Sequence, residues 1–361
     1  MICLNYSTST NQEGTKRMLD DLKYIHEKDA HDALGIVAKQ AAQLRMDLAA
    51  SGTIAFGAVS NIVYAGMGGS ALAALLIHTW PKLARPFEVV RDYTMPNYVD
   101  SNTLCVLASY SGNTEETLSC LAEAEAKGAQ IAIISGGGKL EAIALEKQYP
   151  FVKLPKVEQP RYAVLANYKA LLVLLEKAGV VKSEVLGELS AAGDFIEHAV
   201  PAWLPTVPTA SNPAKQLAQE MLGKSVVIYG GSYLYPAAYK WKISVNENAK
   251  QVAWTGQIPE FNHNEFLGWS EQPIDKPYTV IDLRSDHEHP RVQKRFVVSA
   301  RLLSGKRPEP FVVQCQGDTL LEHLLWALVY GDFVTIYLGL LNELDPAPVE
   351  LVEKFKRILD E

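Results

Sequence analysis

The sequence predicts an α/β protein made of two similar parts, each with a parallel β-sheet flanked by helices. Short apolar runs that suit buried strands alternate with segments of helical periodicity, which is typical of a parallel sheet covered on both faces. Glycine- and serine-rich turns follow two of these runs, at 66–70 and 109–117. The run VVIYGGS at 226–232 echoes the run at 62–66 and the Gly-Gly-Ser after it. The second half therefore repeats the first.

The first half is expected to hold five strands, preceded by a helical region. Residues 15–50 have helical periodicity, with apolar faces that include Leu19, Leu34 and Leu44. Apolar runs then predict strands at 62–65, 87–91, 104–109, 131–135 and 151–154. Amphipathic segments between them predict helices at 70–79, 115–127 and 140–147.

The second half resumes this alternation after a connector. Helical periodicity from 163 to about 200 ends at a proline-rich segment, 201–208, because proline cannot continue a helix interior. Beyond it the sequence predicts strands at 225–229, 278–283 and 311–314, a long helix at 320–341 and an amphipathic helix at 348–361. We therefore expect two domains, 1–180 and 181–361, of which the second lacks the serine-rich loop of the first.

Composition excludes several classes of protein. A chain of 361 residues that is 48% hydrophobic can bury two cores, and a net charge of −7 offers no basic surface for nucleic acid. An uninterrupted apolar run long enough to span a membrane is absent, and the first residues do not resemble a signal peptide. The four cysteines lack metal-binding spacing, and Cys105 is expected to be a buried thiol. We expect a soluble, cytoplasmic protein.

The two turns together suggest a site for a phosphate group. Glycines let the backbone approach a bound group closely, and the amides at a helix start attract an anion. The hydroxyls of Ser70, Ser109, Ser111 and Thr114 add hydrogen-bond donors without adding charge. Turns that follow neighbouring strands of one sheet can enclose a single phosphate from two sides, so a phosphorylated small molecule is the expected ligand.

Each turn also has another interpretation. The pattern Gly66-x-Gly68-x-x-Ala71 fits a dinucleotide-binding turn, with Glu88 or Asp92 as the ribose ligand. A tight turn without a ligand is a further alternative. The second turn could simply cap a helix through Asn113 or Thr114, although capping and anion binding can share one helix start. A dinucleotide fold does not need that second serine-rich loop, which favours the phosphate site.

Several separated motifs, in order, resemble one family. SYSGNTEET at 109–117 with GMGGS at 66–70 looks like the sugar isomerase (SIS) domain, which binds phosphosugars. The segments PRYA (160–163), VNENAK (245–250), PEFNHNEFLGW (259–269) and GDFVTIYLGLLNELDP (331–346) are similar to bifunctional phosphoglucose/phosphomannose isomerases. The resemblance implies two tandem SIS-type domains, an isomerase without metal or cofactor, and a homodimer. It implies substrate binding by Gly68, Gly69, Ser70, Ser109, Ser111 and Thr114.

The resemblance also assigns catalytic roles. An aldose–ketose isomerase needs a carboxylate for the carbon-bound proton, a cation for the enediolate and an acid/base group for ring opening. Glu247 in the NEN motif matches the family's base, and Arg161 in PRYA matches the arginine that stabilises the enediolate. His263 matches the ring-opening histidine, which the family donates across the dimer interface. Lys356 fits the family's C-terminal active-site lysine best.

Alternatives remain for some of these positions. Glu265 could orient a neighbour or serve as the base instead of Glu247, and Lys356 could face solvent together with Lys354 and Arg357. A phosphosugar-binding regulator without catalytic activity is the alternative to an enzyme. The segment 345–348 (DPAP) has no hydroxyl residue, although we expect one there in enzymes that accept mannose as well as glucose. The expected reaction interconverts fructose 6-phosphate with glucose 6-phosphate and mannose 6-phosphate.

Overall fold

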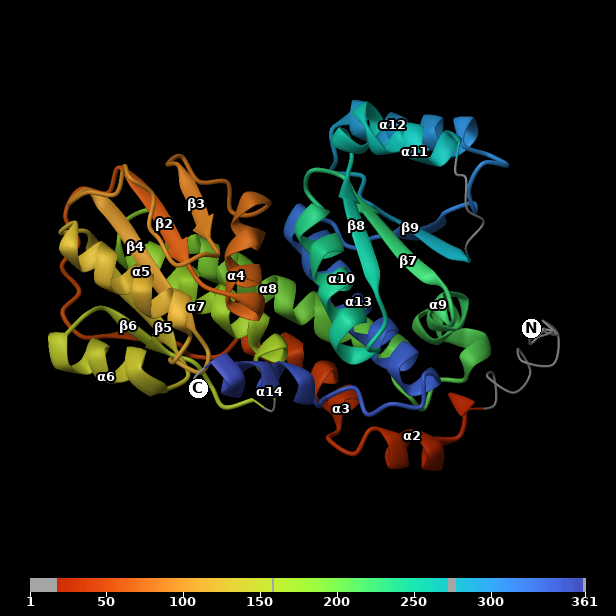
Figure 1. The fold of residues 1–361 in the computed structure, drawn as a ribbon, viewed down its shortest axis with the longest axis horizontal. Coiled ribbons are helices and arrows are strands. Elements are labelled where there is room, and N and C mark those ends of the chain that lie inside the picture. The colour runs from red at the N-terminus through yellow and green to blue at the C-terminus, as the bar shows by residue number, and fades with distance from the viewer. Residues whose placement is uncertain (1–17, 158, 272–276, 360–361) are drawn as a thin grey trace. The chain divides into compact units, whose positions relative to one another are not determined.

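The computed structural model describes residues 18–157, 159–271 and 277–359, and it divides into two compact units. The first unit is Lys39–Glu197, and the second combines Met1–Ala38 with His198–Glu361. Each unit has its own β-sheet covered by helices, which confirms the α/β class (Figure 1). The start of the chain, where no signal peptide was expected and where Cys3 lies, is outside the described residues.

The boundary between the two units falls after Glu197, whereas the sequence predicted a domain boundary after residue 180. Helix α8 (Glu184–Ala199) packs with the first unit, where Arg45 pairs with Asp194 at 2.6 Å. The segment before Lys39 joins the second unit, where the Tyr24 hydroxyl donates to the Leu340 carbonyl over 2.7 Å. Contacts distant in sequence therefore set both boundaries.

The first unit contains a six-stranded sheet in the order β1-β6-β5-β4-β2-β3. Its strands are β1 (Ala50–Ser51), β2 (Asn61–Ala65), β3 (Phe87–Val90), β4 (Thr103–Ser109), β5 (Gln130–Ser135) and β6 (Phe151–Lys153). All five predicted strands are present and parallel, and the short β1 adds an antiparallel edge. Because β1 has only two residues, it left no periodic signal in the sequence.

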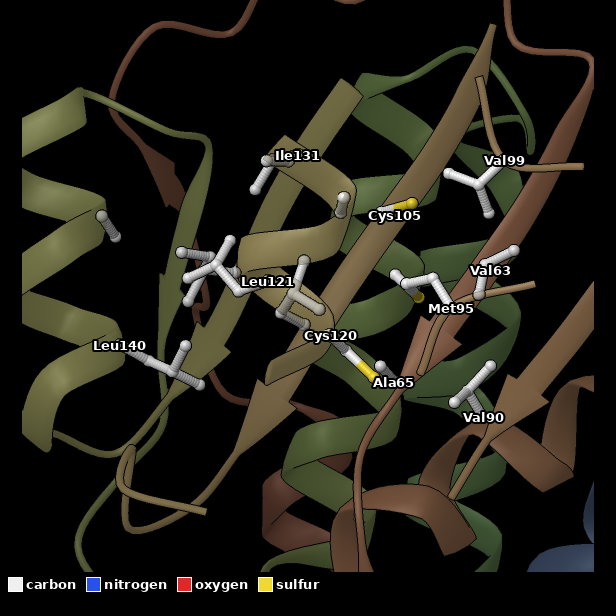
Figure 2. Packing of buried hydrophobic residues seen from close by; sticks show 14 of the residues in the cluster. Val63, Ala65, Val90, Met95, Val99, Cys105, Cys120, Leu121, Ile131 and Leu140 are labelled. Atoms are coloured by element: carbon white, nitrogen blue, oxygen red, sulfur yellow. The ribbon is translucent and has the colours of Figure 1, made fainter. Parts of the chain in front are cut away.

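Helices cover both faces of this sheet. They are α4 (Gly68–Leu75), α5 (Glu115–Ala126), α6 (Gly138–Lys147), α7 (Val164–Lys177) and α8. One face packs its apolar side chains, such as Val63 and Cys105, against Leu121 of α5 and Leu140 of α6 (Figure 2). Helices α4 and α7 pack against each other behind the sheet (Figure 1). The helical stretch predicted from 163 to about 200 is two helices, because Gly179, with φ +64°, ends α7.

The second unit contains a four-stranded parallel sheet in the order β10-β9-β7-β8. Its strands are β7 (Ser225–Gly230), β8 (Ala253–Gln257), β9 (Tyr278–Arg284) and β10 (Phe311–Gln314). Its helices are α2 (Leu22–Lys28), α3 (Ala33–Ala38), α9 (Pro213–Met221), α10 (Tyr235–Asn248), α11 (Glu265–Ser270), α12 (Pro290–Leu302), α13 (Leu320–Leu341) and α14 (Glu350–Leu359). Strand β8, an edge strand whose Trp254 is exposed, was not predicted from the sequence, because the strand lacks an apolar run.

Helix α13 is the core helix of the second unit. Among the described residues it alone is long and apolar enough to cross a membrane, but 94% of its apolar window is buried inside the protein. It packs lengthwise against α9 and α10 on one face of the sheet, whereas Phe261, Trp269 and Phe296 belong to the core on the other face. The capping box of Thr319 and Glu322 fixes its start.

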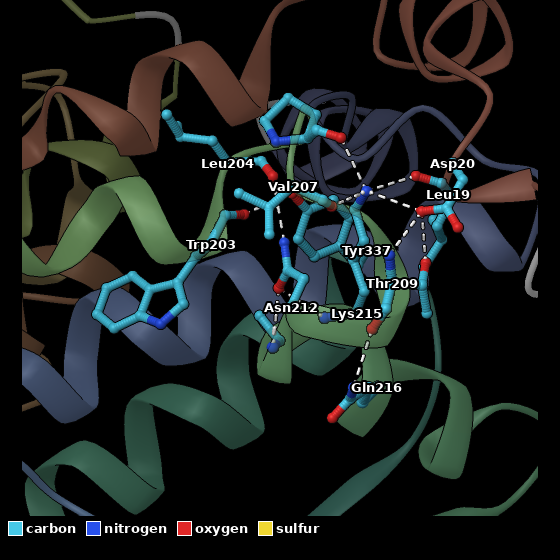
Figure 3. Close-up of polar contacts among 12 residues, drawn as sticks. Leu19, Asp20, Trp203, Leu204, Val207, Thr209, Asn212, Lys215, Gln216 and Tyr337 are labelled. Carbon is cyan, nitrogen blue, oxygen red and sulfur yellow. Dashed lines mark hydrogen bonds and ion pairs between the residues drawn. The ribbon is translucent and has the colours of Figure 1, made fainter.

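A buried lysine ties the N-terminal segment and the proline-rich connector to α9. The fully buried Nζ of Lys215 donates to the carbonyls of Leu19 (2.6 Å), Pro205 (2.8 Å) and Val207 (2.8 Å), as Figure 3 shows in part. Burial lowers the pKa of Lys215, while Asp20, 3.4 Å away, opposes this shift. The three carbonyls would lose this donor if the side chain were shortened, so Lys215 stabilises the contact of these two segments with α9.

Candidate active site

Three hydroxyl groups cluster in the loop that follows β4. Ser109 ends the strand and is buried, and its Oγ lies 2.7 Å from Thr114 Oγ1 and 3.3 Å from Ser111 Oγ. The Ser109 hydroxyl also accepts the Gly112 amide at 3.1 Å. Gly112 has φ +70°, a conformation that suits glycine, and the sharp turn at this residue brings Thr114 back beside Ser109. Hydroxyl hydrogens can rotate, so the same cluster can donate to an anion.

The glycine turn after β2 lies beside this loop, because β2 and β4 are parallel neighbours. A Cβ at Gly66 would lie only 2.8 Å from the Ala108 carbonyl oxygen, so the two turns can lie this close only because residue 66 is a glycine. Helix α4 begins at Gly68, which has φ +49°, and Ser70 is buried in its first turn. The two turns therefore meet at the carboxyl edge of the sheet, as their positions in the sequence predicted.

Arg161 lies against the same glycine turn. It belongs to a short 3-10 helix, Pro160–Ala163, and is only 6% exposed. A Cβ at Gly69 would stand 3.4 Å from the Arg161 Cα, so the backbones of the two segments are in direct contact. Its guanidinium lies over the Tyr162 ring, 4.8 Å from the centroid. The first unit thus places the backbone of a permanently charged residue against the glycine turn.

Glu247 lies in the last turn of α10 and is half-buried. Helix α10 is held against α13 by polar contacts one helical turn apart. Lys240 forms an ion pair with Asp332, and the Ser244 hydroxyl donates to Asp332 Oδ1 at 3.1 Å. Asn248 follows Glu247 directly and donates from Nδ2 to Thr335 Oγ1 at 2.9 Å. These contacts fix the helix that carries the predicted base.

Two glycines let α10 and α13 come this close. A Cβ at Gly331 would collide with the Trp241 indole, and one at Gly339 would lie 2.5 Å from the Asn248 carbonyl oxygen. This contact was not predicted from the sequence, although Asp332 gave a signal as the one acidic residue of the apolar helix beyond its first turn. A charge in such a run needs a partner, and Lys240 provides it.

His263 ends a 3-10 helix, Glu260–His263, and is exposed. Its neighbour Glu265 begins α11, where its carboxylate accepts the Tyr229 hydroxyl, which in turn accepts the Trp269 indole N–H at 2.8 Å. Burial, and then Glu265, raises the pKa of Tyr229. These contacts connect Glu265 to the core of its own unit.

Lys356 lies on α14 and is paired with Glu353 of the same helix at 2.9 Å. Every described residue of that helix is exposed. The predicted site residues thus divide between the units. The hydroxyl loops and Arg161 belong to the first unit, whereas Glu247, His263 and Lys356 belong to the second.

The described part of the chain offers no metal centre. It contains no group of three or more His, Cys, Asp or Glu side chains placed to hold an ion. Cys105, Cys120 and Cys315 are buried free thiols, as expected for Cys105. Burial raises the pKa of Cys105 to about 12 and that of Cys120 to about 11, so both thiols are unreactive near neutral pH.

Both halves of this chain match known protein families. The SIS domain family matches residues 58–176, and the bacterial phospho-glucose isomerase C-terminal SIS domain matches residues 210–359. A crystal structure of a glucose-6-phosphate isomerase like protein from Thermus thermophilus has the same fold. Its TM-score is 0.63 with 18% identity, over 95% of this chain and 99% of that one.

Curated relatives match most of the chain. A bifunctional phosphoglucose/phosphomannose isomerase from Caldicellulosiruptor bescii is 33% identical over 311 residues, which is 84% of this chain and 90% of the relative. One from Aquifex aeolicus is 31% identical and covers 83% of this chain and 90% of the relative. Together with the two matching domains, these similarities show that the chain belongs to the family of bifunctional phosphoglucose/phosphomannose isomerases.

Proposed function

We propose that this protein is an aldose–ketose isomerase that interconverts fructose 6-phosphate with glucose 6-phosphate and mannose 6-phosphate in the cytoplasm. The observation that carries the proposal is the cluster of Ser109, Ser111 and Thr114 hydroxyls beside a glycine turn, which the backbone of Arg161 contacts at Gly69. Uncharged donors and helix-start amides suit a phosphate dianion. Membership of a family of sugar-phosphate isomerases adds the substrate class.

In the proposed mechanism the phosphate anchors the sugar while protons move at the other end. Glu247 removes the proton from carbon 2 of the open aldose, and the carbon 1 oxygen gains a proton to form a cis-enediol. Return of the proton to carbon 1, with loss of the proton from the carbon 2 hydroxyl, gives the ketose. Arg161 and Lys356 stabilise the negative charge on the enediolate oxygens, so the reaction needs neither a metal nor a cofactor.

His263 is proposed to open the sugar ring by moving a proton to and from the ring oxygen, since imidazole titrates near neutral pH. In a homodimer it would act in the partner's site. Its exposure on the protomer supports this role, because a donated residue must be accessible before the subunits associate. Rotation about the bond between carbons 2 and 3 of the enediol would let one base deliver the proton to either face, which gives both aldoses.

A coupled assay that starts from fructose 6-phosphate and reads both aldose 6-phosphates tests the proposal. We expect both products, and the ratio of their initial rates of formation gives the preference of this enzyme, whose DPAP segment at 345–348 lacks a hydroxyl residue. Binding of the phosphosugar without formation of either aldose would instead identify a non-catalytic regulator.

A further inference from the structure

The turn after β7 holds the same position in the second unit as the glycine turn after β2 holds in the first. Strands β2 and β7 each pair with two parallel neighbours, and each leads into a helix, α4 and α10 respectively. Both turns contain Gly-Gly-Ser, which opens α4 as Gly68-Gly69-Ser70 in the first unit and follows directly from the end of β7 as Gly230-Gly231-Ser232 in the second. Both therefore offer backbone amides at a helix start, where an anion binds favourably.

In the second unit, a side chain of the protein itself lies in this position. Glu288 is only 3% exposed, and its Oε1 accepts the amides of Tyr233 (2.7 Å) and Leu234 (3.2 Å), which immediately precede α10. A Cβ at Gly231 would collide with the Glu288 carboxylate, so a glycine is needed where the backbone passes this group. The backbone thus approaches the Glu288 carboxylate as closely as the backbone of a glycine turn approaches a bound oxyanion.

Among the described residues no cation interacts with Glu288, so an ion pair does not account for the burial of this carboxylate. Cys315 lies near enough for its pKa to be raised by burial, then by Asp286 and then by Glu288, so this neighbour supplies no positive charge either. Oε2 has no hydrogen-bond partner among the described residues. Burial raises the pKa of Glu288, and only the Tyr233 and Leu234 amides oppose this shift. The backbone amides and the start of α10 thus hold this carboxylate.

We infer that the second unit retains a small-oxyanion site whose occupant is the carboxylate of Glu288. The site binds its anion as part of the chain, so the glycine turn of the second unit is closed to an external phosphate. The inference concerns the second unit alone and does not depend on the proposed reaction. Removing the carboxylate should leave a site for a free anion of similar size.

Chemical rescue by formate tests this inference. Glu288→Ala removes the carboxylate, whereas the matched variant Glu288→Gln keeps an oxygen that can accept both amides. The melting temperature of each variant and of the wild type is measured with increasing sodium formate, against sodium chloride at equal ionic strength. We expect formate to raise the Tm of Glu288→Ala by about 2–4 °C with saturation, because a ligand that binds only the folded state stabilises it.

The wild type and Glu288→Gln should respond to formate as they do to chloride, because their sites remain filled. An equal response of all three proteins would overturn the inference. If Glu288→Ala does not fold in chloride, recovery of its helical circular dichroism on refolding in formate supports the same conclusion. Failure of formate to restore the fold, where chloride also fails, overturns it.

Discussion

Asn248 donates a hydrogen bond from Nδ2 to Oγ1 of Thr335 over 2.9 Å, and both side chains are fully buried. Asn248 directly follows the proposed base Glu247, so this bond fixes the end of α10 that carries the base against the middle of α13. The pairs formed by Lys240 and Ser244 with Asp332 hold the preceding two turns. The position of Glu247 thus depends on a series of buried polar contacts between α10 and α13.

Thr335→Val should impair catalysis through Glu247. Valine has nearly the same shape but removes the hydroxyl that accepts from the buried Asn248 amide, and loss of such a buried hydrogen bond costs about 1–3 kcal/mol of folding stability. Because the end of α10 is then less well fixed, kcat should fall more than KM changes. Steady-state kinetics and thermal unfolding measure both effects.

Thr279→Val is the matched control, because Thr279 is also buried and its hydroxyl donates a hydrogen bond to the carbonyl of Glu220, on α9, over 2.6 Å. Equal kinetic losses in both variants would contradict the positioning role.

Ser111→Ala should mainly weaken substrate binding. A hydroxyl that contacts the phosphate interacts similarly in the ground state and in the transition state, so its loss raises KM and leaves kcat nearly unchanged. A hydrogen bond to a charged group contributes about 1.5–3 kcal/mol, which predicts a rise in KM of about ten- to a hundredfold. Ser60→Ala, in the same unit but at the start of β2, should retain wild-type kinetics. A fall in kcat at constant KM for Ser111→Ala would refute the assignment.

Removal of metal ions should leave activity intact. The described residues provide no cluster of metal ligands, and the proposed charge stabilisation comes from Arg161 and Lys356. Dialysis against a strong chelator, followed by the isomerase assay in metal-free buffer, should give the original rate. Loss of turnover that a divalent ion restores would overturn the cofactor-free mechanism.

Acid should destabilise the fold through His323. Burial, and then the nearby His287, lowers the pKa of His323 below its ordinary value. Its Nε2 lies 3.0 Å from the Gly317 carbonyl oxygen, while Nδ1 is buried without a partner among the described residues. The unfolded state therefore binds the proton more tightly, so the folding stability that neutral His323 provides is complete above pH 6.5 and is lost as the pH falls through the folded-state pKa.

Chemical unfolding of the wild type and of His323→Gln at several pH values between about 5 and 7 measures this effect. The free energy of unfolding should fall more steeply with acidification in the wild type than in His323→Gln. His78, whose pKa is also lowered by burial, gives a comparison in the first unit. Parallel pH profiles for the wild type and His323→Gln would exclude the histidine as the source.

Much of the fold followed from the sequence because its strands are continuous apolar runs. All seven residues of β4 are buried, and such a run is recognised without knowledge of its neighbours. The edge strand β8 could not be recognised in this way, since its pairing with β7 and its position at the sheet edge come from tertiary contacts. The domain boundary also depends on distant contacts, such as the Arg45–Asp194 ion pair.

The candidate site was predictable where its residues are close in sequence. The Ser109–Thr114 cluster lies in one loop, so spacing alone indicated it. The contact of Glu288 with the amides before α10 joins residues more than fifty positions apart, and a glutamate outside any motif gives no sign of it. The residue types in a sequence indicate which chemistry is possible. The contacts that each side chain makes with distant residues are known only from the structure.

Glu247 and His263 should divide the proton transfers between them. Glu247→Gln keeps the shape but removes the base, so isomerisation should fall by on the order of a hundredfold or more. His263→Ala should impair closed-ring substrates more than an open-chain analogue, because only the closed ring needs opening. Rapid kinetics with each form of substrate measure the difference. Near-normal turnover of Glu247→Gln, or equal losses on both substrates for His263→Ala, would refute the division of roles.

Mixing these two variants tests whether His263 acts in the partner's site. If it does, a heterodimer of Glu247→Gln and His263→Ala collects both lesions in one site and leaves the other site intact. Random exchange of subunits makes about half of the dimers heterodimers, so about a quarter of the wild-type activity should return. Each variant mixed with itself is the control. If both residues serve the site of their own chain, every site in the heterodimer keeps one lesion, and mixing restores nothing.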